Sequence, residues 1–284
     1  MAKLILCGTP IGNLEDMSPR ALRALQEADI VACEDTRRTR KLLTHFGIRA
    51  RSLVVYNEAN ERRKATELVA SIRSGRTVVL VSDAGMPGLS DPGYRLVKAC
   101  ADGGVIVEAV PGPSAVITAV AISGLAPGRF VFEGFLPKKQ GDRKKRIAEL
   151  VEERRTIVFF ESPHRIEVAL EDLLEGLGPR PAALARELTK LHEEVRRGTL
   201  EELLASVVND PPRGEIVLVI AGAIHEHAIE VPAAELASRA RGLMDSGVER
   251  KEALARVAKD AGVRKRAVFD ALVDDGGGAG SSVS

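Results

Sequence analysis

Hydroxyl, carboxyl and glycine residues gather in three loops, each of which follows a short apolar run. The loops read Gly-Thr-Pro-Ile-Gly-Asn-Leu at 8–14, Ser-Asp-Ala-Gly-Met-Pro at 82–87 and Pro-Gly-Pro-Ser-Ala at 111–115. Polar groups at the carboxyl ends of parallel strands lie where open α/β sheets bind ligands, and glycine lets the backbone approach a ligand closely. We therefore expect the three loops to converge on one ligand cleft, with the Asp83 carboxylate in it.

Each loop also has an ordinary structural interpretation. The first matches neither the Gly-x-Gly-x-x-Gly dinucleotide fingerprint nor a Walker A loop, and its Pro10 lacks a backbone donor. It therefore also fits a simple tight turn between a strand and a helix. After the second loop, Asp91 is suited to capping the helix that follows. The third loop places the Ser114 hydroxyl at a helix start.

Further polar groups follow apolar runs elsewhere in the chain. Residues 161–165 come after one such run, and residues 185–193 contain several charges just past another. Ser162 is also an expected helix cap, because Pro163 suits the first helical position. The group Glu-Asp-Thr-Arg at 34–37 is likewise open to two interpretations, a chemical site or a cap for the next helix.

Short apolar runs alternate with helical patterns over the first 125 residues. The runs are almost continuously apolar, as in strands covered on both faces, and the helices repeat apolar residues at three- and four-residue spacing. We expect strands at 4–7, 30–33, 52–55, 77–82 and 105–110, and helices at 19–27, 36–46, 61–74, 93–102 and 114–123. Strand–helix alternation predicts a mainly parallel α/β sheet.

A second set of elements begins at residue 130. We expect strands at 130–133, 156–161, 183–186, 194–198 and 215–221, and helices at 142–153, 163–174 and 200–208. Because there are few crossover helices for these strands, we expect a mixed sheet. The fold class is therefore α/β with two α/β domains, at 1–125 and 126–230, a small helical C-terminal extension at 231–275 and a disordered tail at 276–284.

Composition places few constraints on function. Of the 284 residues, 45% are apolar and 29% are charged, which suits a globular protein, and the net charge is +1. Any site for a polyanion must therefore come from local clustering of basic residues. The three cysteines have no metal-ligand spacing and imply no disulfide framework. No apolar run is long enough for a signal peptide or a membrane span, so we expect a cytoplasmic protein without membrane contact.

Seven of these segments occur in an order that is similar to a known family. They are Gly-Thr-Pro-Ile-Gly-Asn-Leu (8–14), Cys-Glu-Asp-Thr-Arg (33–37), Ser-Asp-Ala-Gly-Met-Pro (82–87), Pro-Gly-Pro-Ser-Ala (111–115), Phe-Glu-Gly-Phe-Leu-Pro (132–137), Glu-Ser-Pro-His-Arg (161–165) and Arg-Glu-Leu-Thr-Lys (186–190). Together they resemble the tetrapyrrole methylase superfamily, and in particular its branch that methylates small-subunit ribosomal RNA. Many tetrapyrrole-type members have Gly-x-Gly-Pro-Gly-Asp in the first loop, so Gly-Thr-Pro-Ile-Gly-Asn favours the RNA branch.

The resemblance implies a class III methyltransferase fold, with S-adenosyl-L-methionine in the cleft between two α/β domains. It also implies 2′-O-methylation of a cytidine ribose in the decoding region of 16S rRNA, carried out by a homodimer. Carried over by motif, the cofactor-binding positions are Pro10, Asp83, Met86, Ser114, Ala115, Phe160, Ala185, Ile220 and Ala221. Among these, Asp83 and Met86 fall near the methionine portion and ribose, and the positions after 125 fall around the adenine.

The implied transfer needs a group that takes the proton of the ribose hydroxyl, because that hydroxyl is a poor nucleophile. The sulfonium donor is already activated, so no metal is required and none is indicated. Candidates for the base are Asp35, Glu161, Glu187 and Lys190, of which we rank Glu187 and Asp35 first. Arg37 and Arg186 are suited to hold the adjacent phosphate through bidentate bonds.

Two basic runs flank the expected cleft. Residues 138–146 include six basic side chains and one acidic one, and residues 37–41 include four basic ones. Such runs either contact phosphate or are simply solvated faces. The extension, with seven basic and four acidic residues between 249 and 272, either grips RNA, braces the fold or contacts a second subunit.

Two other functions remain open from the sequence. A small-molecule methylase acting on a tetrapyrrole would need neither the basic runs nor the helical extension, so these features count against it. A non-catalytic RNA-binding assembly factor would keep the fold without the transfer, and binding of S-adenosyl-L-methionine would distinguish it from an enzyme.

Overall fold

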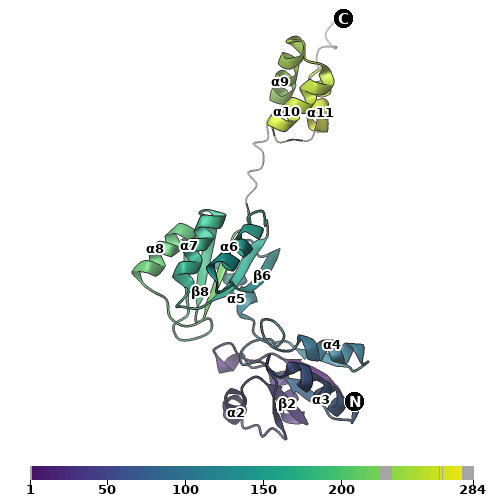
Figure 1. The fold of residues 1–284 in the computed structure, drawn as a ribbon, viewed down its shortest axis with the longest axis vertical. Coiled ribbons are helices and arrows are strands. Elements are labelled where there is room, and N and C mark those ends of the chain that lie inside the picture. Colours follow the sequence, from purple (N-terminus) through teal and green to yellow (C-terminus); the bar gives the residue numbers. More distant parts are fainter. Residues whose placement is uncertain (1, 224–231, 262, 264, 277–284) are drawn as a thin grey trace, which may run out of the picture. The chain divides into compact units, whose positions relative to one another are not determined.

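The chain divides into two compact units, residues 1–222 and residues 223–284 (Figure 1). The structure, a computed structural model, describes residues 2–223, 232–261, 263 and 265–276. Of the tail expected at 276–284, residues 277–284 lie outside the described residues.

The first sheet contains five parallel strands in the order β3–β2–β4–β1–β5. Its strands are β1 (Leu4–Cys7), β2 (Ile30–Cys33), β3 (Leu53–Val55), β4 (Val78–Leu80) and β5 (Val107–Val110). One face packs on α1 (Pro19–Glu27) and α2 (Thr36–His45), and the other on α3 (Glu61–Arg73) and α4 (Tyr94–Asp102). The parallel sheet predicted from the strand–helix alternation is confirmed.

The second sheet has the order β6–β7–β10–β8–β9 and is mixed. Its strands are β6 (Phe130–Phe135), β7 (Thr156–Glu161), β8 (Pro181–Arg186), β9 (Glu194–Thr199) and β10 (Ile216–Ile220). Only the β6–β7 pair is parallel among the described pairings. The mixed sheet expected from the scarcity of crossover helices is therefore confirmed.

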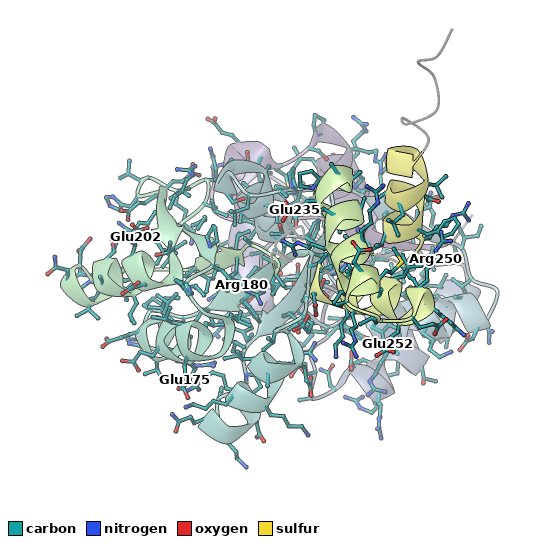
Figure 2. The ribbon with its side chains drawn as sticks, turned by 90° about the horizontal axis from the view of Figure 1, so that it is seen from above. Glu175, Arg180, Glu202, Glu235, Arg250 and Glu252 are labelled. Carbon is teal, nitrogen blue, oxygen red and sulfur yellow. The ribbon has the colours of Figure 1, made fainter. Side chains whose placement is uncertain are left out.

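Helices cover both faces of the second sheet. The helices α6 (Gln140–Glu149), α7 (Ile166–Leu177) and α8 (Leu200–Asn209) pack on one face, and α5 (Ala115–Ser123) packs on the other. Figure 2 labels Glu175 of α7 and Glu202 of α8, two charged residues of the three-helix layer. Because α5 starts directly after β5 of the first sheet yet packs on the second, the third loop lies where the two sheets meet.

Helix caps decide several of the alternatives left open by the sequence. Asp35 and Ser114 do cap α2 and α5, since their side chains accept backbone N–H groups of the first helical turn. Asp91 does not cap α4, whose N-cap is Gly93. Ser162 does not cap α7 either, because that helix starts at Ile166, later than the expected residue 163.

The second unit contains the helices α9 (Ala233–Asp245), α10 (Arg250–Asp260) and α11 (Lys265–Gly276). They share a small core that includes Leu236, Leu254 and Val268. The Arg250 guanidinium, labelled in Figure 2, lies 5.5 Å from the centre of the Phe269 ring. Among the described residues, no helix combines the length and the apolar character needed to cross a membrane.

Candidate functional site

A cavity of about 360 Å³ lies within residues 1–222, where loops of the first sheet meet strand ends of the second. This volume is in the range of small-molecule sites. Its wall on the side of the first sheet is formed by Ile11, Ala84, Gly85, Met86, Leu89, Ser90, Asp91, Ser114, Ala115 and Val116. Its other wall is formed by Phe135, Phe160, Glu161, Ser162, Pro163, Gly214, Glu215, Ile216 and Val217. All three loops that the sequence singled out therefore contribute to one cavity.

The first loop is tied to the other two by backbone contacts. Thr9 and Gly85 exchange two backbone hydrogen bonds, of 2.9 and 3.1 Å, and the Thr9 hydroxyl donates to the Ser82 carbonyl at 3.2 Å. Gly8 lies directly against Gly112, so that a Cβ atom added to Gly8 would be 2.7 Å from Gly112 Cα. Only glycine fits this contact, and the three loops consequently form a connected frame around the cavity.

Asp83 lies in this frame and does not line the cavity. Its carboxylate accepts a hydrogen bond from the Asp35 N–H at 3.3 Å and is 3.4 Å from the Arg38 guanidinium. Its own N–H donates to the Glu34 carboxylate at 3.3 Å. Asp83 therefore fixes the second loop to the start of α2, while Met86, three residues further on, reaches the cavity.

The third loop presents the start of α5 to the cavity. Ser114, Ala115 and Val116 line the wall, and the Ser114 hydroxyl accepts the Ile117 N–H at 3.5 Å. Helix N-termini carry partial positive charge and unsatisfied N–H groups, which favour an anionic or hydrogen-bond-accepting part of a ligand nearby.

Glu161 is the expected catalytic residue that the structure brings to the cavity. Its side chain is 1% exposed, and its Oε2 atom lies 3.4 Å from the Arg165 guanidinium without a hydrogen-bond partner in the structure. The other oxygen, Oε1, accepts the Ser162 N–H at 2.8 Å. Burial raises the pKa of the Glu161 carboxyl, although the Ser162 N–H and Arg165 oppose the shift. A buried acceptor without its donor is suited to binding a polar ligand group.

Asp35 and Glu187, ranked first as bases, do not line the cavity. The Arg37 side chain, together with the Arg37 N–H, lowers the pKa of Asp35. A hydrogen bond from Lys190 and another from the Glu215 N–H lower the pKa of Glu187. Both carboxylates are therefore held by hydrogen-bond partners that lower their pKa.

Lys190 and Arg186 do not line the cavity themselves, and both form ion pairs. Burial lowers the pKa of Lys190, but its hydrogen bonds to Glu187 and Glu215 outweigh this effect and the net pKa is raised. The Lys190 ammonium is therefore held by the carboxylates of Glu187 and Glu215. Arg186 pairs with Glu194, just as Arg37 pairs with Asp35.

Several expected cofactor positions lie away from the cavity. Pro10 follows Thr9 in the frame without lining the wall, and Ala185 is buried within β8. Ile220 pairs with Ile157 and Ala182, at the end of β10 opposite to Ile216. Ile220 and Ala221 therefore do not line the cavity, whereas Ile216 and Val217 do. Met86, Ser114, Ala115 and Phe160 do line it.

Asp91 lines the cavity and was not among the expected site residues. Burial raises the pKa of its carboxyl to about 7, helped by the negative charges of Glu34 and Asp83 and opposed by a hydrogen bond with the Ser82 side chain. Its position in a glycine-rich loop after a buried strand is a sequence signal for a site residue. The sequence interpretation assigned Asp91 to helix capping instead. Within the described residues, no group of three or more His, Cys, Asp or Glu side chains could hold a metal ion.

Comparisons with known proteins agree with this architecture. A family profile described as Tetrapyrrole (Corrin/Porphyrin) Methylases matches residues 3–204. A protein named ribosomal RNA small subunit methyltransferase I, from Mycobacterium tuberculosis (strain CDC 1551 / Oshkosh), is 49% identical over 95% of this chain and 94% of its own length. The chain therefore belongs to the tetrapyrrole (corrin/porphyrin) methylase family, in the branch of the ribosomal RNA small subunit methyltransferase I proteins.

Solved structures share the fold of the first unit. A crystal structure of uroporphyrin-III-C-methyltransferase from Thermus thermophilus has a TM-score of 0.55 and 25% identity, and the match covers 77% of this chain and 94% of that one. A structure of that enzyme complexed with S-adenyl homocysteine has a TM-score of 0.55 and 22% identity, covering 77% and 97%. These likenesses support the fold class.

Proposed function

We propose that the protein is an S-adenosyl-L-methionine-dependent methyltransferase that modifies the 2′-hydroxyl of a cytidine ribose in the decoding region of 16S rRNA. The observation that carries this proposal is the 49% identity, over 95% of the chain, to a protein named ribosomal RNA small subunit methyltransferase I. The same proposal includes a homodimer, a cytoplasmic location and one α/β domain per sheet, at 1–125 and 126–230.

The cavity residues fit S-adenosyl-L-methionine. Phe160, Ile216 and Val217 offer apolar surface for an adenine ring, and the orphaned Glu161 Oε2 is an acceptor for a hydroxyl or amino group. Carboxyl groups in the wall favour a cationic ligand over an anionic one. The Gly8–Gly112 contact keeps side chains out of the space beside Met86. When bound, the cofactor supplies a methyl carbon activated by a positively charged sulfur.

The basic run on α2 is a candidate for contacting RNA phosphates. Arg40 and Lys41 are exposed, and neither forms an ion pair within the described part of the chain. On α6, by contrast, Arg143, Lys144 and Arg146 are paired with acidic residues. The run at 138–146 therefore offers less free positive charge than its sequence indicates, although Lys138, Lys139 and Lys145 are exposed and form no ion pair within the described residues.

Reversing both free charges of α2, in Arg40→Glu/Lys41→Glu, is expected to weaken RNA binding and leave affinity for S-adenosylhomocysteine unchanged. If each side chain contacts one phosphate, the slope of log K against log salt falls by roughly 1.4 to 1.8. Salt titrations of binding to small-subunit particles measure this. The matched control is Arg62→Glu/Arg63→Glu, an equal charge change on α3, which packs on the opposite face of the first sheet. An equal loss in both variants would contradict a specific α2 contact.

The activity itself is tested by methylating small-subunit particles that lack the modification and mapping the product at nucleotide resolution. We expect one 2′-O-methylated cytidine in the decoding region. A methyl group on a base atom, or transfer only to free tetrapyrrole, would contradict the proposal. Calorimetry with S-adenosyl-L-methionine distinguishes an enzyme from a non-catalytic RNA-binding factor. Folded protein that shows no detectable binding would favour the non-catalytic factor.

A further inference from the structure

The three carboxyl groups that line the cavity differ in their partners. Glu161 lies 3.4 Å from the Arg165 guanidinium, and Glu215 lies 3.0 Å from the Lys190 ammonium. Asp91 forms no ion pair with a basic side chain in the part of the chain that the structure describes. The cations beside Glu161 and Glu215 hold these two carboxyls in ion pairs, whereas the Asp91 carboxyl is left available to a ligand in the same cavity.

The loop that carries Asp91 holds it in place without using its side chain as a helix cap. Ser90 has φ of +60°, a left-handed conformation that costs energy for a non-glycine residue. Gly88 and Gly93 lie against each other, since a Cβ added to Gly93 would be 3.1 Å from Gly88 N. Gly93 is the N-cap of α4. The strained and closely packed loop thus places the Asp91 carboxyl at the cavity wall. This carboxyl does not cap α4.

The groups facing Asp91 are mainly acidic or neutral. Glu34 and Asp83 are its charged neighbours, the Ser82 side chain hydrogen-bonds it, and the other cavity carboxyls are Glu161 and Glu215. The nearby cation Arg38 is paired with Asp83. Partial burial, together with the negative charges of Glu34 and Asp83, raises the pKa of the Asp91 carboxyl to about 7. A group that titrates near the working pH is well matched to proton transfer.

We propose that Asp91 is the catalytic residue that accepts the proton of the ribose 2′-hydroxyl, an inference that rests on the function proposed above. In this step the 2′-oxygen forms a bond to the methyl carbon while the bond from that carbon to sulfur breaks, and its electron pair stays on sulfur. The hydroxyl proton moves to an Asp91 carboxylate oxygen and from there to water. The charge of the sulfonium is thereby balanced by the released proton.

Asp91→Asn tests this role because it keeps the shape of the side chain and removes its basicity. We expect kcat to fall by about 10²- to 10⁴-fold, the usual contribution of a general base, while affinity for S-adenosylhomocysteine stays within about threefold of wild type. We expect Asp91→Glu to retain part of the activity that Asp91→Asn loses. The matched control is Glu161→Gln at the paired carboxyl, which we expect to change KM more than kcat.

The pH profile gives a readout that a structural role would not produce. The active form of Asp91 is the carboxylate, so wild-type kcat/KM rises with pH up to about 7 and then levels. The residual activity of Asp91→Asn loses this step. A binding measurement gives a second readout that needs no turnover. Because a carboxylate attracts the positively charged sulfonium, wild-type affinity for S-adenosylmethionine relative to S-adenosylhomocysteine rises as the pH passes about 7. This rise is absent in Asp91→Asn.

Three outcomes would overturn the assignment. They are wild-type kcat in Asp91→Asn, an unchanged pH profile in that variant, or the large loss of kcat in Glu161→Gln instead. Failure of the underlying function is seen separately, as wild-type protein that makes no 2′-O-methylated product.

Discussion

Gly112→Ala is expected to abolish binding of S-adenosylhomocysteine and to lower the free energy of unfolding by about 1–3 kcal/mol, the usual cost of overpacking. The added Cβ would lie 2.8 Å from Gly8 Cα and 2.9 Å from the Gly8 carbonyl carbon. Both atoms belong to the backbone, so no side chain can turn aside to make room. The first and third loops must separate instead.

Separation of the first and third loops is expected to displace the cavity residues of the second loop as well. The first loop is bonded to the second by the two hydrogen bonds between Thr9 and Gly85, so a shift of Gly8 moves Gly85 and its neighbour Met86, both of which line the wall. Calorimetry and urea unfolding measure the two effects. Gly128→Ala is the control, since nothing lies within 4 Å of the Cβ it would add. Normal binding in Gly112→Ala would show that the frame does not position the site.

Local patterns were sufficient to predict the architecture and the converging loops. Strands such as β2 and β4 are buried throughout because helices cover both faces, and this produces the continuous apolar runs that identify them. The loops after β1, β4 and β5 meet because the carboxyl ends of parallel strands share one edge. Neither inference needs information about contacts between distant residues.

The predicted site positions that lie away from the cavity depend on such distant contacts. The antiparallel pairing of β10 with β7 and β8 determines which end of β10 reaches the cavity. The local sequence pattern does not show in which direction a strand runs within its sheet. The basicity of Glu187 is set by Lys190 and by the N–H of Glu215, which is 28 residues away in the chain. The raised pKa of Asp91 depends in part on Glu34, which comes from a different loop, although the glycine-rich loop after β4 was a local signal for Asp91 itself.

Arg143 gives the clearest case of a misleading local pattern. It stands within a run of basic residues at 138–146, and the sequence indicated an exposed surface. The side chains of Arg143 and its partner Asp172 are in fact only 7% and 5% exposed, and Arg143 Nε donates to Asp172 Oδ2 at 2.6 Å. The guanidinium also donates to the carbonyls of Pro137 and Lys138, at 3.3 and 3.2 Å. It therefore joins α6 to α7 and fixes the chain that leads from β6 into α6.

Removing one partner of this pair is expected to cost far more than removing both. Asp172→Leu leaves a buried guanidinium without its counter-charge and should lower the free energy of unfolding by about 3–5 kcal/mol, whereas Arg143→Met/Asp172→Leu should come within about 1 kcal/mol of wild type or exceed it. Urea unfolding measures both. Lys144→Ala, which breaks the exposed pair with Glu175, is the control and should cost about 0–1 kcal/mol. If Asp172→Leu cost no more than Lys144→Ala, the pair would contribute like a surface contact, and its burial would not explain why this arginine is unavailable to RNA.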